Sequence, residues 1–155
     1  MIVTPAWLSE NLEAHSTVLL TGGFDPLHYG HVRYFQQAAN IGLPIVVGVA
    51  PDSYIVKKHP ILQPIEHRME TIDAIRWVTY VADQNDESAA TLIRAVRPRF
   101  FIKGDIWLKR GLPKIEQIAM NDVGTEIKYI NVHPVKSTDL LHKFAWDFMD
   151  TLGRS

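Results

Sequence analysis

The sequence predicts an α/β fold: a Rossmann-like, five-stranded parallel sheet with helices on both faces, in a single domain. Five short apolar segments alternate along the chain with segments of helical periodicity. This alternation is typical of right-handed βαβ crossovers, which make neighbouring strands parallel and place helices on both sides of the sheet. The length of 155 residues suits one compact domain and leaves no room for two.

The five predicted strands are short runs of β-branched, aliphatic and aromatic residues. The first ends at the pair Gly22 and Gly23, and the second is fully apolar, as expected for a central strand that is buried on both faces. The strands are predicted at residues 16–21, 44–50, 79–82, 99–103 and 126–132.

Apolar residues at helical spacing predict the helices between the strands. The helix at 64–78 opens with Pro64, because proline is tolerated at the first helical position. The last helix is predicted to turn four apolar residues inwards: Leu140, Leu141, Phe144 and Phe148. The helices are predicted at 31–42, 64–78, 86–97, 113–124 and 137–149, and residues 1–15, with Trp7, Leu8 and Leu12, are expected to form a peripheral helix on the outside of the 1–155 domain.

Composition excludes several classes of protein. The chain is 46% hydrophobic and 21% charged, and its formal net charge of -1 gives no general attraction to nucleic acid or to an anionic membrane. The absence of cysteine excludes disulfides and thiolate metal sites. No apolar run approaches the ~20 residues that span a bilayer, and the N-terminus lacks the pattern of a signal peptide. We therefore expect a cytoplasmic protein without a nucleic-acid or membrane partner, in which any anion site is local.

The segment LLTGGFDPLHYGHVRYF connects the first strand to the next helix. It lies beyond the carboxyl end of the strand, where open parallel sheets bind their ligands. Gly22, Gly23 and Gly30 allow a ligand to approach the backbone, and the first amides of the helix favour an anion. His28 and His31 are three residues apart and project to the same side of that helix. The segment therefore predicts a pocket of hydrogen-bond donors that suits a phosphate chain.

The histidine pattern has an ordinary alternative, because a single histidine is more often a polar surface or core residue than a catalyst. With 7 His and 9 Gly in 155 residues, the pattern H-x-G-H has a chance expectation of about 0.02 in this chain. Its position directly after the first strand lowers that expectation further. Coincidence is therefore a poor explanation.

The stretch GGFDPLHYGH resembles the G-x-F-D-x-x-H-x-G-H signature of the cytidylyltransferase-like nucleotidyltransferases. Glycerol-3-phosphate cytidylyltransferase and heptose-1-phosphate adenylyltransferase are the members that the chain resembles most, and the likeness runs from Val18 to about Leu141. The resemblance implies transfer of a nucleotidyl group from CTP or ATP to a small phosphorylated acceptor, a polyol or sugar phosphate, with release of pyrophosphate. It also implies Mg²⁺ bound through the nucleotide phosphates, with no metal ligand from the protein.

The resemblance assigns roles to three groups of residues. The catalytic residues that it implies are His28, His31 and Lys58. The nucleotide-binding residues that it implies are Gly22, Gly23, Phe24, Asp25, Gly30, Arg68, Arg76, Lys103, Gly104, Asp105, Lys136, Ser137 and Thr138. The substrate-binding residues that it implies are Asp52 and Trp107.

Three positions depart from the family pattern. Asp139 is the third residue of a motif that usually reads S-T-T or S-T-S, and Val132 stands where the glycerol enzymes have an arginine. Lys136 is a candidate replacement for that arginine. Ile106 stands where a second acidic residue is common. These departures leave the base of the nucleotide and the identity of the acceptor open.

Structural roles compete with several of these assignments. Lys58 belongs to a lysine pair in a polar loop, and Arg68 is suited to holding a loop against a helix. Arg76 lies near the end of its predicted helix, where a cation is favourable. Ser137 and Thr138 are good N-cap residues. We interpret His59, His67, His133 and His142 as structural or surface residues.

Three other functions remain as alternatives. The altered KSTDLL segment fits a catalytically inactive nucleotide-binding module that serves regulation or assembly. A dinucleotide-dependent dehydrogenase is disfavoured because the loop lacks the G-x-G-x-x-G spacing, and a metal hydrolase is disfavoured because no third ligand follows from the sequence. The apolar surface of Trp7, Trp77 and Trp146, together with the family resemblance, indicates a homodimer or a higher homo-oligomer.

Overall fold

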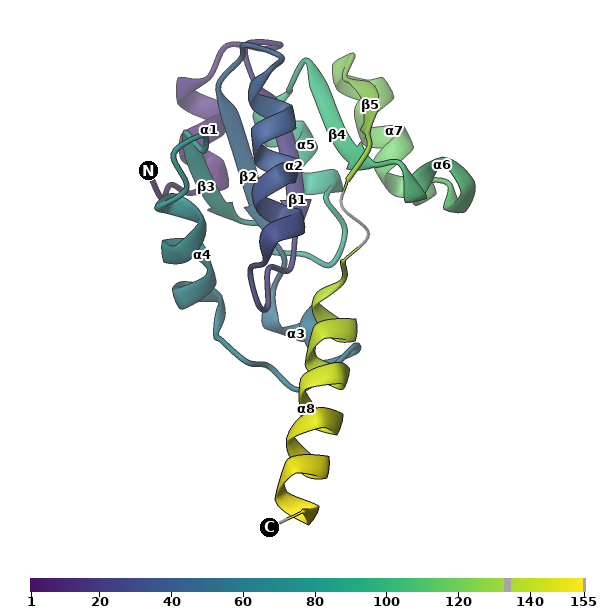
Figure 1. Cartoon of the computed structure of the whole chain (residues 1–155). Coiled ribbons are helices and arrows are strands. Elements are labelled where there is room, and N and C mark those ends of the chain that lie inside the picture. The colour runs from purple at the N-terminus through teal and green to yellow at the C-terminus, as the bar shows by residue number, and fades with distance from the viewer. Residues whose placement is uncertain (133–134, 155) are drawn as a thin grey trace.

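The computed structural model describes residues 1–132 and 135–154, and it confirms the predicted α/β fold. Of the four histidines interpreted as structural or surface residues, His133 lies outside the residues that the structure describes. All strand pairs are parallel, and the strand order is β3-β2-β1-β4-β5. Figure 1 shows the twisted sheet with helices on both sides. The strands are β1 Val18–Gly22, β2 Ile45–Val49, β3 Tyr80–Asp83, β4 Phe100–Gly104 and β5 Glu126–Ile130.

The sheet separates two hydrophobic cores, because successive side chains of a strand point to opposite faces. In β1, Leu19 belongs to one core, whereas Val18 and Leu20 belong to the other. The first core is covered by α1 Pro5–Asn11, α5 Ala90–Val96 and α7 Lys114–Val123. The second core is covered by α2 Tyr29–Ala39 and α4 Ile65–Asp73.

The N-terminal segment contributes to the first core as well as covering it. Leu8 of α1 is fully buried and packs against α5. The backbone of Val3 donates to the carbonyl of Val81, and the backbone of Val81 donates to the carbonyl of Met1. The predicted outer helix is therefore held to the sheet by a buried leucine and by two backbone hydrogen bonds to β3.

Several helix boundaries differ from the prediction. The helix predicted at 64–78 ends at Asp73, and Ile75 and Val78 then form tight turns and pack into the second core. Apolar periodicity continued beyond the helix because the following turns bury their side chains on the same side. The helix predicted from residue 86 begins at Ala90, and two short helices were not predicted, α3 Asp52–Ile55 and α6 Ile106–Arg110.

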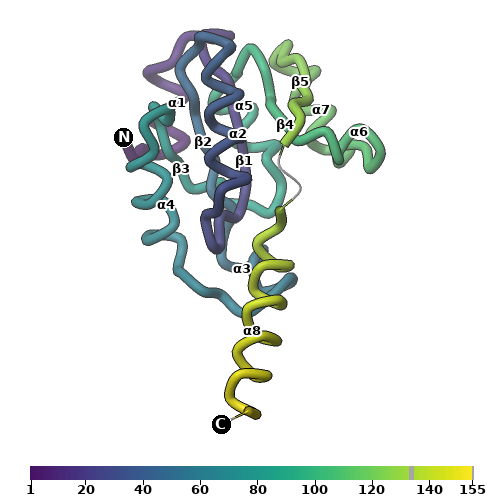
Figure 2. Tube along the Cα trace, in the orientation of Figure 1, coloured from purple at the N-terminus to yellow at the C-terminus, as the bar shows by residue number. Residues whose placement is uncertain are grey.

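The last helix, α8 Ser137–Gly153, contradicts one prediction. Figure 2 shows it running away from the rest of the chain. The side chains predicted to face inwards are largely exposed, with Leu140 at 38%, Phe144 at 68% and Phe148 at 52%. The apolar stripe of α8 exists, but the body of the domain does not cover it. Every helix in the described part of the chain is too short or too polar to cross a membrane.

Candidate functional site

Three adjoining pockets lie at the carboxyl edge of the sheet, beyond β1, β2 and β4. We name them after one lining residue each: the His31 pocket of about 200 Å³, the Ser137 pocket of about 530 Å³ and the Glu116 pocket of about 290 Å³. Trp107 lines all three, and Lys58 lines the Ser137 and Glu116 pockets. Since they share walls, the three pockets form one branched cleft.

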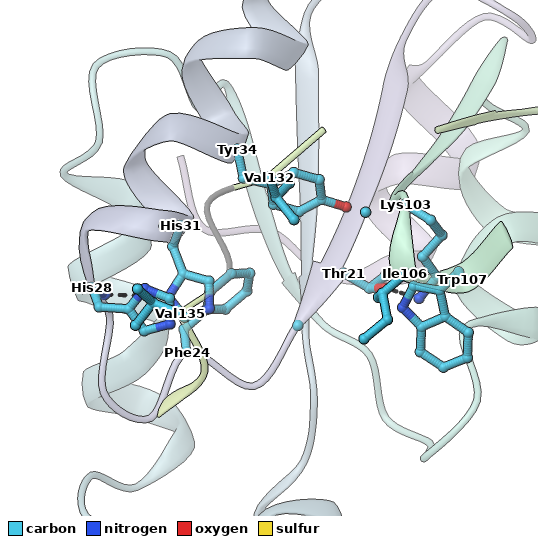
Figure 3. Close-up of a pocket in the computed structure, with 13 residues that line it drawn as sticks. Thr21, Phe24, His28, His31, Tyr34, Lys103, Ile106, Trp107, Val132 and Val135 are labelled. Carbon is cyan, nitrogen blue, oxygen red and sulfur yellow. Dashed lines mark hydrogen bonds between the residues drawn. The ribbon is translucent and has the colours of Figure 1, made fainter. Parts of the chain in front are cut away.

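The two predicted histidines meet at the first turn of α2. His28 is the N-cap residue, and its backbone N–H donates to Nδ1 of His31 at 3.2 Å. The imidazole rings stack with their centroids 3.7 Å apart. Figure 3 shows this pair on one side of the His31 pocket, with Lys103 and Trp107 on the other side. The spacing of three residues produces this contact, because a side chain at position N3 of a helix reaches back to the N-cap backbone.

The environment of His31 fixes its protonation. Burial lowers the pKa of His31 to about 3, and the nearby charge of His28 is a second, smaller cause. The ring is therefore neutral at neutral pH. Because Nδ1 accepts a hydrogen bond, the proton resides on Nε2. His31 can thus offer an uncharged N–H donor to a ligand in the pocket.

The Phe24 ring packs against the ring of His31. The contact is edge-on with 4.9 Å between the ring centroids, and the Phe24 ring also contacts Phe35 at 5.6 Å. The backbone of Phe24 has φ 54, in the left-handed region that few residues other than glycine adopt. A strained residue at a ligand-facing turn is a common feature of functional sites. Phe24 is 3% exposed, so it forms the floor of the site.

The glycine pair has a structural reason that the sequence did not reveal. A Cβ on Gly22 would lie 2.8 Å from Cζ of Phe24, and a Cβ on Gly23 would lie 2.5 Å from Cδ1 of Ile55. A side chain at either position would displace its neighbour, the Phe24 ring at Gly22 and the terminal methyl group of Ile55 at Gly23. Their backbone also borders the cleft, because both residues line pockets.

Asp25 organises the loop that follows α3. Its side chain is 1% exposed, and its two carboxylate oxygens accept hydrogen bonds from the backbone N–H groups of Leu62 and Gln63 at 2.8 and 2.9 Å. The two amide donors give the buried carboxylate a structural role in this loop. Asp25 lines the Ser137 pocket, and its two hydrogen bonds tie that part of the cleft to the loop after α3.

Arg68 is a buried link between the loops around the site. Its side chain is fully buried and forms an ion pair with Asp52 at 2.5 Å. Its remaining donors bind three backbone carbonyl groups: Gly23 at 2.8 Å, Ala50 at 2.7 Å and Gln63 at 3.0 Å. Neither Arg68 nor Asp52 lines any of the three pockets. The structure thus places both residues behind the cleft, where they position its backbone.

Four cationic side chains line the cleft: Lys58, Lys103, Arg110 and Lys136. Lys58 is exposed, and its ammonium lies 4.2 Å from the centroid of the Tyr54 ring. Lys103 donates to Oγ1 of Thr21 at 3.3 Å and lies 4.8 Å from the Trp107 ring. Burial lowers the pKa of Lys103, while Glu116 opposes that shift and Lys58 adds to it. The third cation, Arg110 of α6, lines the Ser137 pocket.

The start of α8 closes the Ser137 pocket. Ser137 and Thr138 were expected to be N-cap residues, but Lys136 occupies the N-cap position. Ser137 and Thr138 are instead the first two residues of the helix. The hydroxyl of Ser137 donates to the carbonyl of Pro26 at 2.8 Å, which ties α8 to the loop before α2. Lys136, Ser137 and Thr138 all line this pocket together with the two histidines.

Besides Arg68, two residues predicted to bind nucleotide lie outside the cleft, Arg76 and Asp105. Arg76 is exposed and stacks on Trp77 at 5.6 Å, and it precedes β3 at the opposite edge of the sheet. Asp105 is the N-cap of α6 and its backbone N–H donates to the carbonyl of Ile130. By contrast, Gly30 and Gly104 line the His31 pocket, as does Lys103.

Several lining residues were not found from the sequence. His59 and Arg110 line the Ser137 pocket, and Thr21 and Tyr34 line the His31 pocket. The Glu116 pocket adds four more: Tyr54, Gln84, Glu87 and Glu116. Thr21 and Tyr34 belong to β1 and α2, on either side of the histidine motif. The others come from α3 and the loop after it, from α6 and α7, and from the loop after β3, which reach the site only through the tertiary fold. For Arg110 and Glu116, no local sequence pattern pointed to the cleft.

Comparison with known proteins identifies the family. Residues 19–144 match the family model described as cytidylyltransferase-like. The chain therefore belongs to the cytidylyltransferase-like family, which confirms the predicted family.

Curated relatives include several proteins named bifunctional protein HldE. The one from Chromohalobacter salexigens is 31% identical over 131 residues, which are 82% of this chain and 27% of the relative. The one from Halorhodospira halophila is 36% identical over 110 residues, which are 68% of this chain and 22% of the relative. The chain thus spans about a quarter of the length of these relatives.

Solved structures share the fold. The lipopolysaccharide core biosynthesis protein from Thermoplasma volcanium GSS1 matches with a TM-score of 0.62 and 24% identity, over 77% of this chain and 98% of that chain. A pantoate-beta-alanine ligase from Francisella tularensis matches with a TM-score of 0.60 and 10% identity, over 88% of this chain and 71% of that chain. These likenesses confirm the architecture of the chain.

Proposed function

We propose that this chain is a nucleotidyltransferase that transfers a nucleotidyl group from CTP or ATP to a small polyol or sugar phosphate. One observation carries the proposal: His31, held neutral with its proton on Nε2, lies where the His31 and Ser137 pockets meet. A phosphate chain needs donors at that point, and the membership of the cytidylyltransferase-like family supports the same reaction.

The branched cleft suits an in-line displacement at the α-phosphorus. Such a reaction needs the attacking and leaving oxygens on opposite sides of phosphorus. The Glu116 and Ser137 pockets are separate branches that share the wall formed by Gly23, Lys58 and Trp107. We assign the acceptor phosphate to the Glu116 pocket and the departing pyrophosphate to the Ser137 pocket.

The chemistry requires one bond to form and one to break. An oxygen of the acceptor phosphate forms a bond to the α-phosphorus, and the bond between that phosphorus and the oxygen bridging to the β-phosphate breaks. The electron pair leaves with pyrophosphate. Because a phosphate dianion is already a nucleophile, no proton has to be removed from the acceptor. The protein therefore acts by alignment and by stabilising the charge that spreads onto the departing group.

Distinct groups would share the stabilisation of charge. The neutral N–H of His31 would donate to the α-phosphate, and Lys58 would follow the phosphates as a mobile cation. In the Ser137 pocket, Arg110, Lys136 and the first amides of α8 would hold pyrophosphate, since the first N–H groups of a helix have no partner within it. Lys136 and Arg110 thus stand in for the arginine that is absent at Val132.

Mg²⁺ is compatible with this arrangement when the nucleotide supplies its ligands. Among the described residues, no three side chains of His, Asp or Glu gather as a metal cluster. Mg²⁺ ordinarily binds to substrate phosphates and keeps several waters, so it needs no cage of protein ligands. Bound in this way, it would neutralise charge on the phosphates while His28, His31 and Lys58 orient them.

Two further parts of the proposal concern the protein's surroundings. A cytoplasmic location fits a protein whose proposed substrates, a nucleoside triphosphate and a phosphorylated acceptor, are both soluble. Self-association fits the exposed apolar side chains of α8, of which Trp146 at 79% is the most exposed.

Release of pyrophosphate tests the proposed reaction. The protein is incubated with Mg²⁺, with CTP or ATP, and with glycerol 3-phosphate or a hexose or heptose 1-phosphate. We expect release of pyrophosphate that depends on both the nucleotide and the acceptor. Binding of a nucleotide without turnover for any pair would instead favour the inactive nucleotide-binding module, which the altered KSTDLL segment also fits.

A further inference from the structure

Glu116 is a buried carboxylate with one oxygen that nothing in the domain satisfies. The residue is 5% exposed and belongs to α7. Its Oε1 accepts a hydrogen bond from the backbone N–H of Ala89 at 3.0 Å. Its Oε2 has no hydrogen-bond partner among the described residues. Since buried polar atoms are nearly always bonded, this oxygen requires an explanation.

The position of Glu116 indicates that the partner comes from a ligand. Glu116 lines the Glu116 pocket, a space of about 290 Å³. A buried acceptor without a partner costs stability, and a hydrogen bond to a charged group is stronger than one between neutral groups. A buried oxygen without a partner, on a residue that lines a pocket of this size, is therefore suited to accepting a hydrogen bond from a ligand that binds there.

The charges around the pocket decide what kind of donor fits. Lys58 and Lys103 line the same pocket, and Glu116 is close enough to Lys103 to affect its charge state. The other carboxylate of the wall, Glu87, is paired with Lys57 at 2.5 Å. Two lysines attract a phosphate and repel an ammonium group. The ligand that matches this wall carries a phosphate for the lysines and an uncharged donor, a hydroxyl group, for Glu116.

We propose that Oε2 of Glu116 accepts a hydrogen bond from a hydroxyl group of the acceptor, which makes Glu116 the residue that selects a polyhydroxylated phosphate. The inference rests on the proposed function, because it places the acceptor in the Glu116 pocket. It adds a specificity-determining residue on α7, outside every motif that the sequence analysis used. Simple alkyl phosphates would satisfy the lysines but would offer Oε2 no donor, and aminoalkyl phosphates would bring an ammonium group that Lys58 and Lys103 repel.

Glu116→Gln is the informative variant. The amide oxygen of the new side chain can keep the hydrogen bond from Ala89, so the fold is retained. The amide nitrogen then replaces Oε2 and turns an acceptor into a donor. Glu70→Gln is the matched control, because Glu70 is an exposed residue of α4 and lines none of the three pockets.

Calorimetric binding without nucleotide tests the inference. The probes are glycerol 3-phosphate, ribose 5-phosphate and mannose 1-phosphate, compared with ethyl phosphate and 2-aminoethyl phosphate. In the parent protein, at least one hydroxylated probe should bind roughly 10- to 100-fold more tightly than ethyl phosphate. That margin should disappear in Glu116→Gln and persist in Glu70→Gln.

The outcomes are distinct. The inference is overturned if no hydroxylated probe exceeds ethyl phosphate in the parent protein, if 2-aminoethyl phosphate binds best, or if Glu116→Gln keeps the full margin. The comparison within the parent protein stands even if the variant does not fold. Failure of the proposed function would look different: the binding margin would be present, but no acceptor would release pyrophosphate from CTP or ATP.

Discussion

His28 and His31 stack with an angle of 21° between their ring planes, and the backbone N–H of His28 donates to Nδ1 of His31. The two contacts leave Nε2 of His31 as the group that carries a proton. They also show why the spacing of three residues matters: it joins a capping interaction of α2 to a hydrogen-bond donor at the cleft. The same local geometry thus serves the helix and the site.

Replacing His31 by two different amides should separate these roles. In His31→Asn, the side chain can still accept from the His28 backbone but lacks the Nε2 donor, so we expect turnover to fall by ~10²–10³. In His31→Gln, the amide reaches the position of Nε2, so we expect a smaller loss. Initial rates of pyrophosphate release measure both variants. Equal activity of His31→Asn and the parent protein would remove His31 from the mechanism.

The lowered pKa of His31 predicts a loss of stability in acid. Between pH about 6.5 and 3, the unfolded chain binds a proton at this residue and the folded chain does not. The free energy of unfolding therefore decreases as the pH falls through this window, by at most ~1.4 kcal/mol per pH unit from this group. Thermal unfolding of the parent and His31→Gln at pH 7, 6, 5 and 4 measures the effect. A constant difference between the two proteins would show that His31 titrates normally.

Gly22→Ala should disturb the site through Phe24. The new methyl group would lie 2.8 Å from the Phe24 ring, which must move and carries the ring of His31 with it. We expect a loss of about 1–3 kcal/mol in the free energy of unfolding, together with reduced turnover. The control is Gly153→Ala, where a methyl group meets nothing within 4 Å. Retention of full stability and activity by Gly22→Ala would contradict this account of the floor of the site.

Arg68→Met should destabilise the fold more than a surface substitution of the same kind. The change leaves the buried carbonyl groups of Gly23 and Ala50 without a donor and breaks the ion pair with Asp52, so we expect a loss of about 3–5 kcal/mol. Arg94→Met is the control, because its ion pair with Asp122 is exposed and worth below about 1 kcal/mol. Urea unfolding compares the two. Similar small losses would indicate that Arg68 does not hold the loops.

The exposed face of α8 should tolerate polar residues. Phe144→Ser and Trp146→Ser alter side chains that are 68% and 79% exposed, so each should change the free energy of unfolding by less than about 0.5 kcal/mol. Leu8→Ala, in contrast, removes a fully buried side chain and should cost about 2–5 kcal/mol. Urea unfolding at low protein concentration measures all three. A large loss in either α8 variant would mean that this face is covered in solution.

The sequence was sufficient for the sheet because each strand carries its own signal. The predicted runs at 44–50 and 99–103 overlap β2 and β4, since a buried parallel strand must be apolar on both faces. The contact between His28 and His31 could also be predicted from the sequence, because the two residues belong to one turn of helix. Local patterns therefore predicted what local structure determines.

The rest of the site depended on tertiary structure. Glu116 belongs to α7 and Arg110 to α6, and neither has a local pattern that points to the cleft. The resemblance of the EHR segment to the family predicted that Arg68 binds nucleotide. The burial of its guanidinium behind the cleft follows only from the packing of α4. For α8, periodicity predicted an apolar stripe, yet periodicity does not determine what covers that stripe.

A crystal structure with a non-hydrolysable triphosphate and Mg²⁺ tests the central claim most directly. We predict that the phosphate chain lies at the junction of the His31 and Ser137 pockets, within hydrogen-bond distance of Nε2 of His31 and close to Lys58. A triphosphate bound at another edge of the sheet, or bound here with both imidazole rings turned away from the phosphates, would contradict the account.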